Sequence, residues 1–231
     1  MTREPGADAR DMFAVHAMFR REFGAIPRLV SSATDGDERQ AAVLADHIAL
    51  LIKILEVHHS SEDQHLWPLI RERGGQEVGA IVDIMEQQHA GIHDGYRRLE
   101  EALAGWRESA SAASRDAVAG AGSAFLPLLE EHLALEETRA VPQIERHLTK
   151  AEYARMAEHG AANTPEDIFL VSFGMIMYEG EPEVIDNIVA DMPAGVRLFI
   201  RELAAVAYAG YAKKIYGTTT PDPRPAAGPA R

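Results

Sequence analysis

Apolar side chains recur along most of this chain at steps of three and four residues, the spacing of one face of an α-helix. In the first segment the apolar stripe also contains a histidine, His16. No strand–turn–strand pattern interrupts the helical spacing, so the sequence predicts an all-α fold. It predicts four long helices, over residues 8–29, 38–73, 77–106 and from a turn at 109–114 to about 147.

Short segments of turn-forming residues separate these helices, at 31–37, 73–76 and 109–114. Pro68 must kink or end the second helix, because proline has no amide hydrogen and clashes with the preceding turn. Four long helices with short connections pack most simply as an up-down-up-down bundle. Side chains that face inward would then meet near the middle of the bundle.

The last third of the chain follows a different pattern. Thr149 and Glu152 have the spacing of a capping box, and shorter helices are predicted over 165–179, up to about 191, and over 193–216. This region is rich in Phe, Met and Tyr, which favours a helical cap packed on the bundle, or a homodimer interface, over a substrate pocket. The predicted domains are a bundle over 1–148, a C-terminal helical extension over 149–216 and a disordered tail over 217–231.

Composition narrows the function. The net charge of −13 over 231 residues argues against nucleic acid or an anionic membrane surface as a partner. The absence of cysteine excludes disulfides, thiolate ligands and iron–sulfur clusters, so any metal must be held by nitrogen and oxygen. The N-terminus has no apolar signal core and the longest apolar run, 168–178, is too short to span a bilayer. We therefore expect a cytoplasmic protein.

The candidate chemistry lies in a pattern that occurs twice. His58 is followed four residues later by Glu62, and His132 is followed four residues later by Glu136, with a proline six residues after each glutamate. Residues four apart lie on one face of a helix, one turn apart. Each copy therefore directs an imidazole and a carboxylate toward the same point, as a metal ion requires.

One further histidine precedes each copy at a matching distance. His16 lies 42 residues before the first copy and His89 lies 43 residues before the second. The halves differ four residues later, where His93 follows His89 but Arg20 follows His16. Burying so many ionisable groups without a metal would be costly, so the pattern predicts a two-metal site. Histidine and carboxylate ligands suit iron, manganese or zinc.

Other histidines in the sequence compete for the role of metal ligand. Elements of the form Glu-x2-His, ending at His65 and His89, are typical of ferritin-like bundles. Such bundles also need one glutamate from each of two further helices, and Glu22 and Glu130 could fill these positions only awkwardly. His59 is excluded as a ligand in this interpretation, because adjacent residues point about 100° apart around a helix. His47 has no partner at ligand spacing and is expected at the surface.

The order of these residues resembles the hemerythrin family, and more closely its bacterial hemerythrin-like, or HHE, branch, over roughly residues 10–148. The resemblance implies a hemerythrin-like bundle with additional C-terminal helices and a centre of two iron ions joined by an oxo or hydroxo bridge. It also implies three ligand sets, which are His89, His93 and His132 for one iron, His16 and His58 for the other, and Glu62 and Glu136 as bridges.

An iron with only two histidines would keep a position open for dioxygen, hydrogen peroxide or nitric oxide, and hydrogen peroxide decomposition is one expected activity. Arg20 either lies beside the ligands and polarises the bound oxygen species, or is a solvated surface arginine.

Two alternative functions remain open. One is a di-iron oxidase or oxygenase with a small organic substrate under residues 164–216, in a pocket lined by Phe169, Phe173, Met177 and Tyr178. The other is an oxygen- or iron-sensing module whose C-terminal helices bind a partner.

Overall fold

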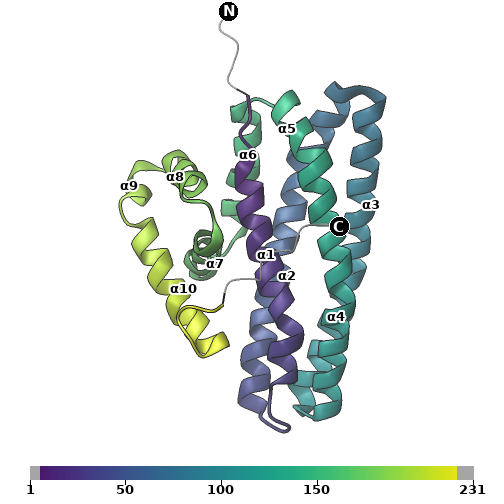
Figure 1. The fold of residues 1–231 in the computed structure, drawn as a ribbon, viewed down its shortest axis with the longest axis vertical. Helices are drawn as coiled ribbons and strands as arrows, with labels where there is room; N and C mark the ends of the chain where they lie inside the picture. Colours follow the sequence, from purple (N-terminus) through teal and green to yellow (C-terminus); the bar gives the residue numbers. More distant parts are fainter. Residues whose placement is uncertain (1–5, 223–231) are drawn as a thin grey trace, which may run out of the picture.

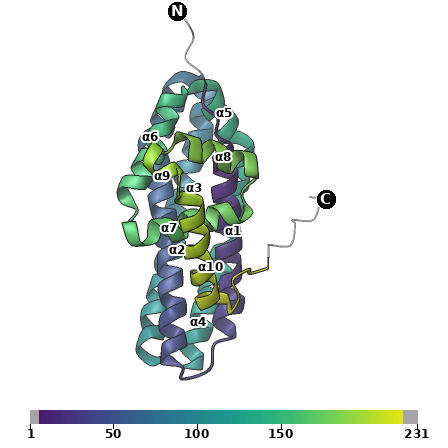
Figure 2. The ribbon, with the colours of Figure 1, turned by 90° about the vertical axis from the view of Figure 1, so that its left-hand side faces the viewer.

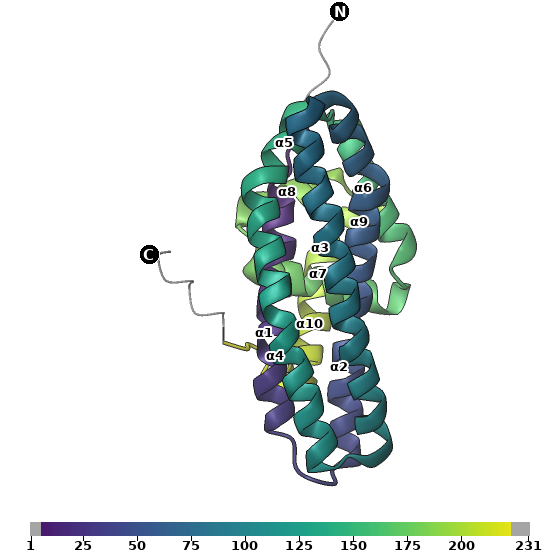
Figure 3. The same cartoon turned by 90° about the vertical axis from the view of Figure 1, so that its right-hand side faces the viewer.

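Four long helical columns lie side by side in the computed structural model (Figure 1), which describes residues 6–222 apart from the side chains of residues 166 and 167. The predicted all-α bundle is confirmed, and Figure 3 shows its columns along the long axis. They are built from α1 (Arg10–Ser31), from α2 (Glu38–His65), from the part of α3 (Trp67–Ser109) after its reversal at Gly75, and from α4 (Ala112–Leu135). The last continues through a π-helical turn (Glu136–Ala140) into α5 (Val141–His147).

Local chemistry explains where the columns begin and end. The side chain of Asp37 caps α2 by accepting a hydrogen bond from the backbone nitrogen of Gln40 at 2.9 Å. Pro68 lies in the first turn of α3, where its missing amide hydrogen costs nothing, so the predicted helix over 38–73 divides at Leu66. Gly75, with a φ of 72°, then reverses the chain inside α3, as seen at the upper end of Figure 3.

The core of the bundle is divided into two apolar clusters. One contains Phe19 of α1 and Ile92 of α3, and the other contains Met12 of α1 and Met85 of α3. Between them on α1 lies His16, which is fully buried. The same order of apolar, histidine and apolar positions recurs on the other columns. The bundle therefore carries a polar layer at mid-length with a dry core on either side.

The C-terminal helices cover one side of this bundle. α6 (Lys150–Asn163) packs on α2 and begins with the predicted capping box of Thr149 and Glu152. Figure 2 shows the helices after α6 lying across α1 and α2, on the side away from α3 and α4 in Figure 3. These are α7 (Glu166–Glu179), α8 (Pro182–Asp191), α9 (Ala194–Arg197) and α10 (Ile200–Tyr216).

A buried ionic network joins the C-terminal helices to the bundle at Glu22 of α1. Its carboxylate accepts hydrogen bonds from Arg21 at 2.6 Å, Tyr208 at 3.1 Å and Tyr216 at 2.5 Å. The ring of His47 lies 3.5 Å away, so this histidine is buried and not at the surface as predicted. Burial lowers the pKa of His47 to about 4, which keeps its ring neutral at physiological pH.

The chain after α10 returns to the same region, where the carbonyl of Pro221 accepts a hydrogen bond from the hydroxyl of Tyr178 at 2.8 Å. Residues 223–231 of the predicted tail lie outside the described residues. Within the part of the chain that is described, no helix combines the length and the hydropathy needed to cross a bilayer.

Removing the hydroxyl of Tyr216 should loosen the C-terminal helices more than removing that of Tyr178. Tyr216→Phe loses a hydrogen bond to a carboxylate and should lower the free energy of unfolding by about 1.5–3 kcal/mol, against about 1 kcal/mol for Tyr178→Phe, which loses a bond to a carbonyl. Urea denaturation of both variants measures the difference. Equal losses would show that the Glu22 network does not hold these helices in place.

Candidate metal centre

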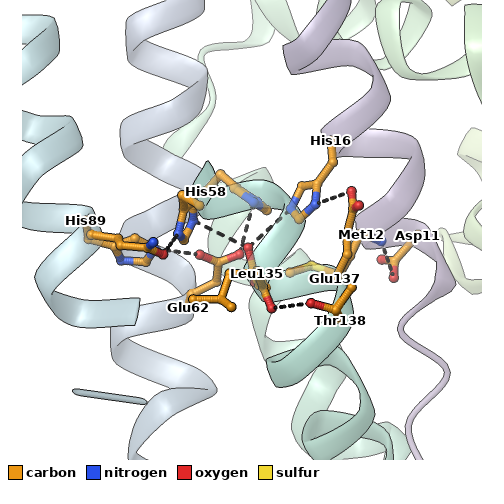
Figure 4. Close-up of polar contacts among 12 residues, drawn as sticks. Asp11, Met12, His16, His58, Glu62, His89, Leu135, Glu137 and Thr138 are labelled. Carbon is orange, nitrogen blue, oxygen red and sulfur yellow. Dashed lines mark hydrogen bonds and ion pairs between the residues drawn. The ribbon is translucent and has the colours of Figure 1, made fainter. Parts of the chain in front are cut away.

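The polar layer gathers histidines and glutamates from all four columns. α1 supplies His16, α2 supplies His58, His59 and Glu62, α3 supplies His89, and α4 with the π-helical turn supplies His132 and Glu136. All seven are buried, with exposed fractions of 0–7 %. Figure 4 shows His16, His58, Glu62 and His89 pointing toward one another. Two groups have ligand atoms within 4.8 Å of one another, namely His16, His58, Glu62 and Glu136, and His59, Glu62, His89 and His132.

Each of the two carboxylates reaches histidines of both groups. One oxygen of Glu62 lies 3.0 Å from Nε2 of His58, and the other lies 3.3 Å from Nε2 of His89. Oε2 of Glu136 lies 3.4 Å from Nε2 of His16 and 3.5 Å from Nε2 of His132. Both carboxylates are therefore placed to bridge two cations.

The layer contains more buried polar atoms than the protein itself satisfies. The Nε2 atoms of five histidines and both oxygens of two glutamates have no hydrogen-bond partner among the described residues. Leaving such groups unpaired in an apolar interior is expensive, so native proteins rarely do so without a reason. A pair of metal ions would engage all of them, and the donor set suits iron, manganese or zinc. The residues present therefore fit a two-metal centre.

In three of these histidines the second ring nitrogen, Nδ1, contacts a polar side chain of the protein. Nδ1 of His16 lies 3.0 Å from Glu137, and Nδ1 of His89 lies 2.8 Å from Asp63. Nδ1 of His132 lies 3.2 Å from the side-chain oxygen of Gln88. Partners of this kind fix the orientation and tautomer of a metal-binding histidine and leave Nε2 free for the metal. The sequence pattern had not identified these three partners.

Arg20 contacts one of these three partners, Glu137. Its guanidinium bonds to Glu137, with one contact of 3.1 Å, and to Glu130 at 3.2 Å. Glu137 in turn contacts His16, and it does so from the π-helical turn, a rare element that occurs often at functional sites. Arg20 is thus neither a free surface arginine nor a neighbour of the ligand atoms, because Glu137 stands between its guanidinium and the centre.

The structure differs from the sequence interpretation at two histidines. His93 does not join the layer, since its side chain is 57 % exposed and its ring packs beside Tyr96. His59, which had been excluded, is 6 % exposed, and its ring stacks on that of His89 at 4.0 Å. The exclusion assumed that α2 faces a single target, whereas α2 lies between two groups. Neighbouring residues pointing about 100° apart can serve one group each.

The histidines of the layer differ in pKa, because carboxylates contact some of them more closely than others. Burial would lower the pKa of His16, but contact with Glu136 and Glu137 raises it to about 9, and Asp63 and Glu62 raise that of His89 to about 10 against the same burial. Burial and the nearby His89 lower the pKa of His132 to about 3 and hold that of His59 well below its usual value. Without metal, two rings are therefore cationic at neutral pH and two are neutral.

A helical bundle whose mid-length layer is built from buried histidine and glutamate is typical of one class of cation-binding protein. The chain matches the family model described as the hemerythrin HHE cation binding domain over residues 8–159, and it belongs to this family. The match runs beyond the predicted bundle into α6. Neither a curated protein nor a solved structure matches the chain significantly. Family membership and the buried cluster together support cation binding at this layer.

Metal binding should release protons. At pH 7.5 the rings of His16 and His89 carry protons in the metal-free protein, and both must lose them to become ligands, so loading should release about two protons per chain. The release should vanish above about pH 10, where these rings are already neutral. Zn²⁺ addition to metal-free protein in dilute buffer with a pH indicator measures it. Loading without proton release at pH 7.5 would contradict the raised pKa values.

Proposed function

We propose that this chain is a cytoplasmic, non-heme di-iron protein of the hemerythrin type, which binds dioxygen, hydrogen peroxide or nitric oxide. The observation that carries the proposal is the set of buried nitrogens and oxygens around Glu62 and Glu136 that have no hydrogen-bond partner among the described residues. The donor set alone also suits manganese and zinc, and family membership favours iron.

The ligand assignment follows the two groups. We assign His59, His89 and His132 to one iron and His16 and His58 to the other, with Glu62 and Glu136 as bridges. One iron then has one histidine more than the other, as the sequence predicted, and His59 takes the place of His93. An iron held by His16 and His58 with the two glutamates would have fewer protein ligands, which would leave room for a small ligand.

The protein's own residues prepare this chemistry in two ways. A bound di-iron pair supplies reversible redox chemistry toward oxygen-derived ligands. The apolar clusters above and below the layer exclude water, and Glu137, Asp63 and Gln88 keep three rings in their binding orientation. If hydrogen peroxide is the substrate, two molecules yield one dioxygen and two waters, so no further reductant is needed.

The oxygenase alternative has less support. Phe173 is 5 % exposed and packs with Ile185 and Ile200, and Phe169 and Met177 pack against the same cluster. Tyr178 packs on the bundle core. The predicted lining of a substrate pocket is thus engaged in side-chain packing, which favours a small ligand over an organic substrate beneath these helices.

Two neighbouring histidine variants test the assignment. His59→Ala should lose iron, because it removes a ligand and leaves other buried donors uncompensated, whereas His93→Ala should retain two irons per chain like the wild type. Iron content after expression in iron-replete medium measures this. Loss of iron in His93→Ala, with none in His59→Ala, would reverse the assignment.

The visible spectrum of the same samples tests the ligand. Oxygen added to the reduced wild type should produce a new band, and the band should be weak or absent in His59→Ala. A band that reverses under vacuum supports binding, and one that decays faster with peroxide supports turnover. Two irons per chain with no response to oxygen, peroxide or nitric oxide would refute the proposed function.

The predicted homodimer is favoured by one surface feature. Five apolar side chains on α9, α10 and the link between them are exposed by 39–75 %, and Phe199, Leu203 and Val206 share one helix face. Two copies with a net charge of −13 each repel one another, so an interface between them must be apolar, and this strip would meet itself across a two-fold axis. The five are Val196, Leu198, Phe199, Leu203 and Val206.

Val206→Glu should convert a dimer into a monomer, because it puts a charge inside the apolar strip of each copy, where burial against the partner would leave it unpaired. Ile84→Glu, which adds the same charge at an exposed apolar position on α3, should leave the dimer intact. Light scattering coupled to gel filtration measures both masses. A monomeric wild type would remove the homodimer from the proposal.

A further inference from the structure

A pocket of about 500 Å³ lies between α2 and α3, and every residue that lines it comes from these two helices. No described residue of the C-terminal extension is part of its lining. Its lining includes the histidine that the sequence assigned to the metal and the structure places at the surface. The side chains that matter are Glu56, Asp63, Glu86, His59, His89 and His93.

The inner wall of the pocket is part of the metal centre. His59 and His89 line the pocket and are only 6 % and 7 % exposed, and the Nε2 atoms of both lack a hydrogen-bond partner among the described residues. Asp63 also lines the pocket and bonds to Nδ1 of His89 at 2.8 Å. The pocket therefore connects the protein surface to two of the buried histidines.

The outer wall is acidic and well exposed. The side chains of Asp63, Glu86 and His93 are 46 %, 52 % and 57 % exposed, and that of Glu56 is 37 % exposed. Among the described residues, the lining of the pocket includes no lysine or arginine. Arg71 bonds to Glu86 at 2.8 Å and Lys53 lies 3.8 Å from Glu56, so neighbouring cations offset part of this charge from outside the lining.

This arrangement selects for a cation. The three carboxylates of the lining outnumber its one cationic ring, His89, and a net negative recess raises the local concentration of cations and speeds their association. Dioxygen, hydrogen peroxide and nitric oxide are uncharged and gain nothing from three carboxylates. Carboxylate oxygens together with an imidazole are ligands that ferrous iron and similar divalent cations accept in exchange for water.

We propose that this pocket is the route by which a divalent cation enters the buried centre. Glu56, Glu86 and His93 take up the hydrated ion at the surface, and Asp63 lies between them and His89 on the inner wall. His93 then has a role in loading and not in holding the metal. The inference rests on the proposed function to the extent that the layer must bind metal.

Uptake kinetics test the route. Metal-free protein is mixed with Co²⁺ in a stopped-flow spectrometer, and the visible absorption of the bound ion is followed at low salt. Glu56→Gln/Glu86→Gln should bind Co²⁺ about tenfold more slowly than the wild type, with the same final amount bound. The wild-type rate should fall as salt is added, and the variant rate should depend less on salt.

A control with the same change in charge separates steering from net charge. Glu101→Gln/Glu108→Gln removes two exposed carboxylates from the same helix outside the pocket lining and should keep the wild-type rate. His93→Asn should slow uptake without lowering the amount bound. Equal rates in pocket and control variants would overturn the entry route and leave the proposed function intact, whereas failure of the wild type to bind Co²⁺, Fe²⁺ or Zn²⁺ would overturn both.

Discussion

Burying ionisable side chains in a dry helical bundle is the constraint on which this structure depends. Nine nitrogens and oxygens of the metal layer lie in the interior without a hydrogen-bond partner among the described residues, between two apolar clusters. Removing such atoms from water costs several kcal/mol each unless a cation or a hydrogen bond compensates. The four columns must therefore hold one register, because a shift of any helix by one turn would move its histidine into a cluster of apolar side chains.

The buried carboxylates Glu22 and Glu62 have different surroundings, which indicate that one stabilises the fold and the other can bind a cation. Glu22 is surrounded by donors of its own chain, with Arg21, Tyr208 and Tyr216 on its oxygens. Glu62 is equally buried, but its oxygens have no hydrogen-bond partner among the described residues, and their neighbours are the ligand nitrogens of His58 and His89. The first makes a polar joint that holds the C-terminal helices to the bundle, and the second keeps its acceptor capacity for a cation. Burial alone would not have separated the two.

The helical spacing and the repeated His-x3-Glu pattern predicted the bundle and most of the layer, because both depend on local periodicity. The pattern failed where tertiary placement decides. On α3 the buried stripe passes from His89 to Ile92 and Tyr96, so His93 falls outside it even though it is four residues from His89. His59 could be placed only once α2 was known to lie between two groups. The Glu22 network was unpredictable, since its tyrosines lie more than 180 residues away in the sequence.

The adjacent histidines of α2 have a mechanical consequence. His58 belongs to one group and His59 to the other, and their side chains leave the helix about 100° apart. A rotation of α2 about its own axis that brings one ring toward its group must carry the other ring away. The two groups of the layer are thus coupled through a single helix. If each group holds a cation, a change in coordination at one would be transmitted to the other as a twist of the backbone between them.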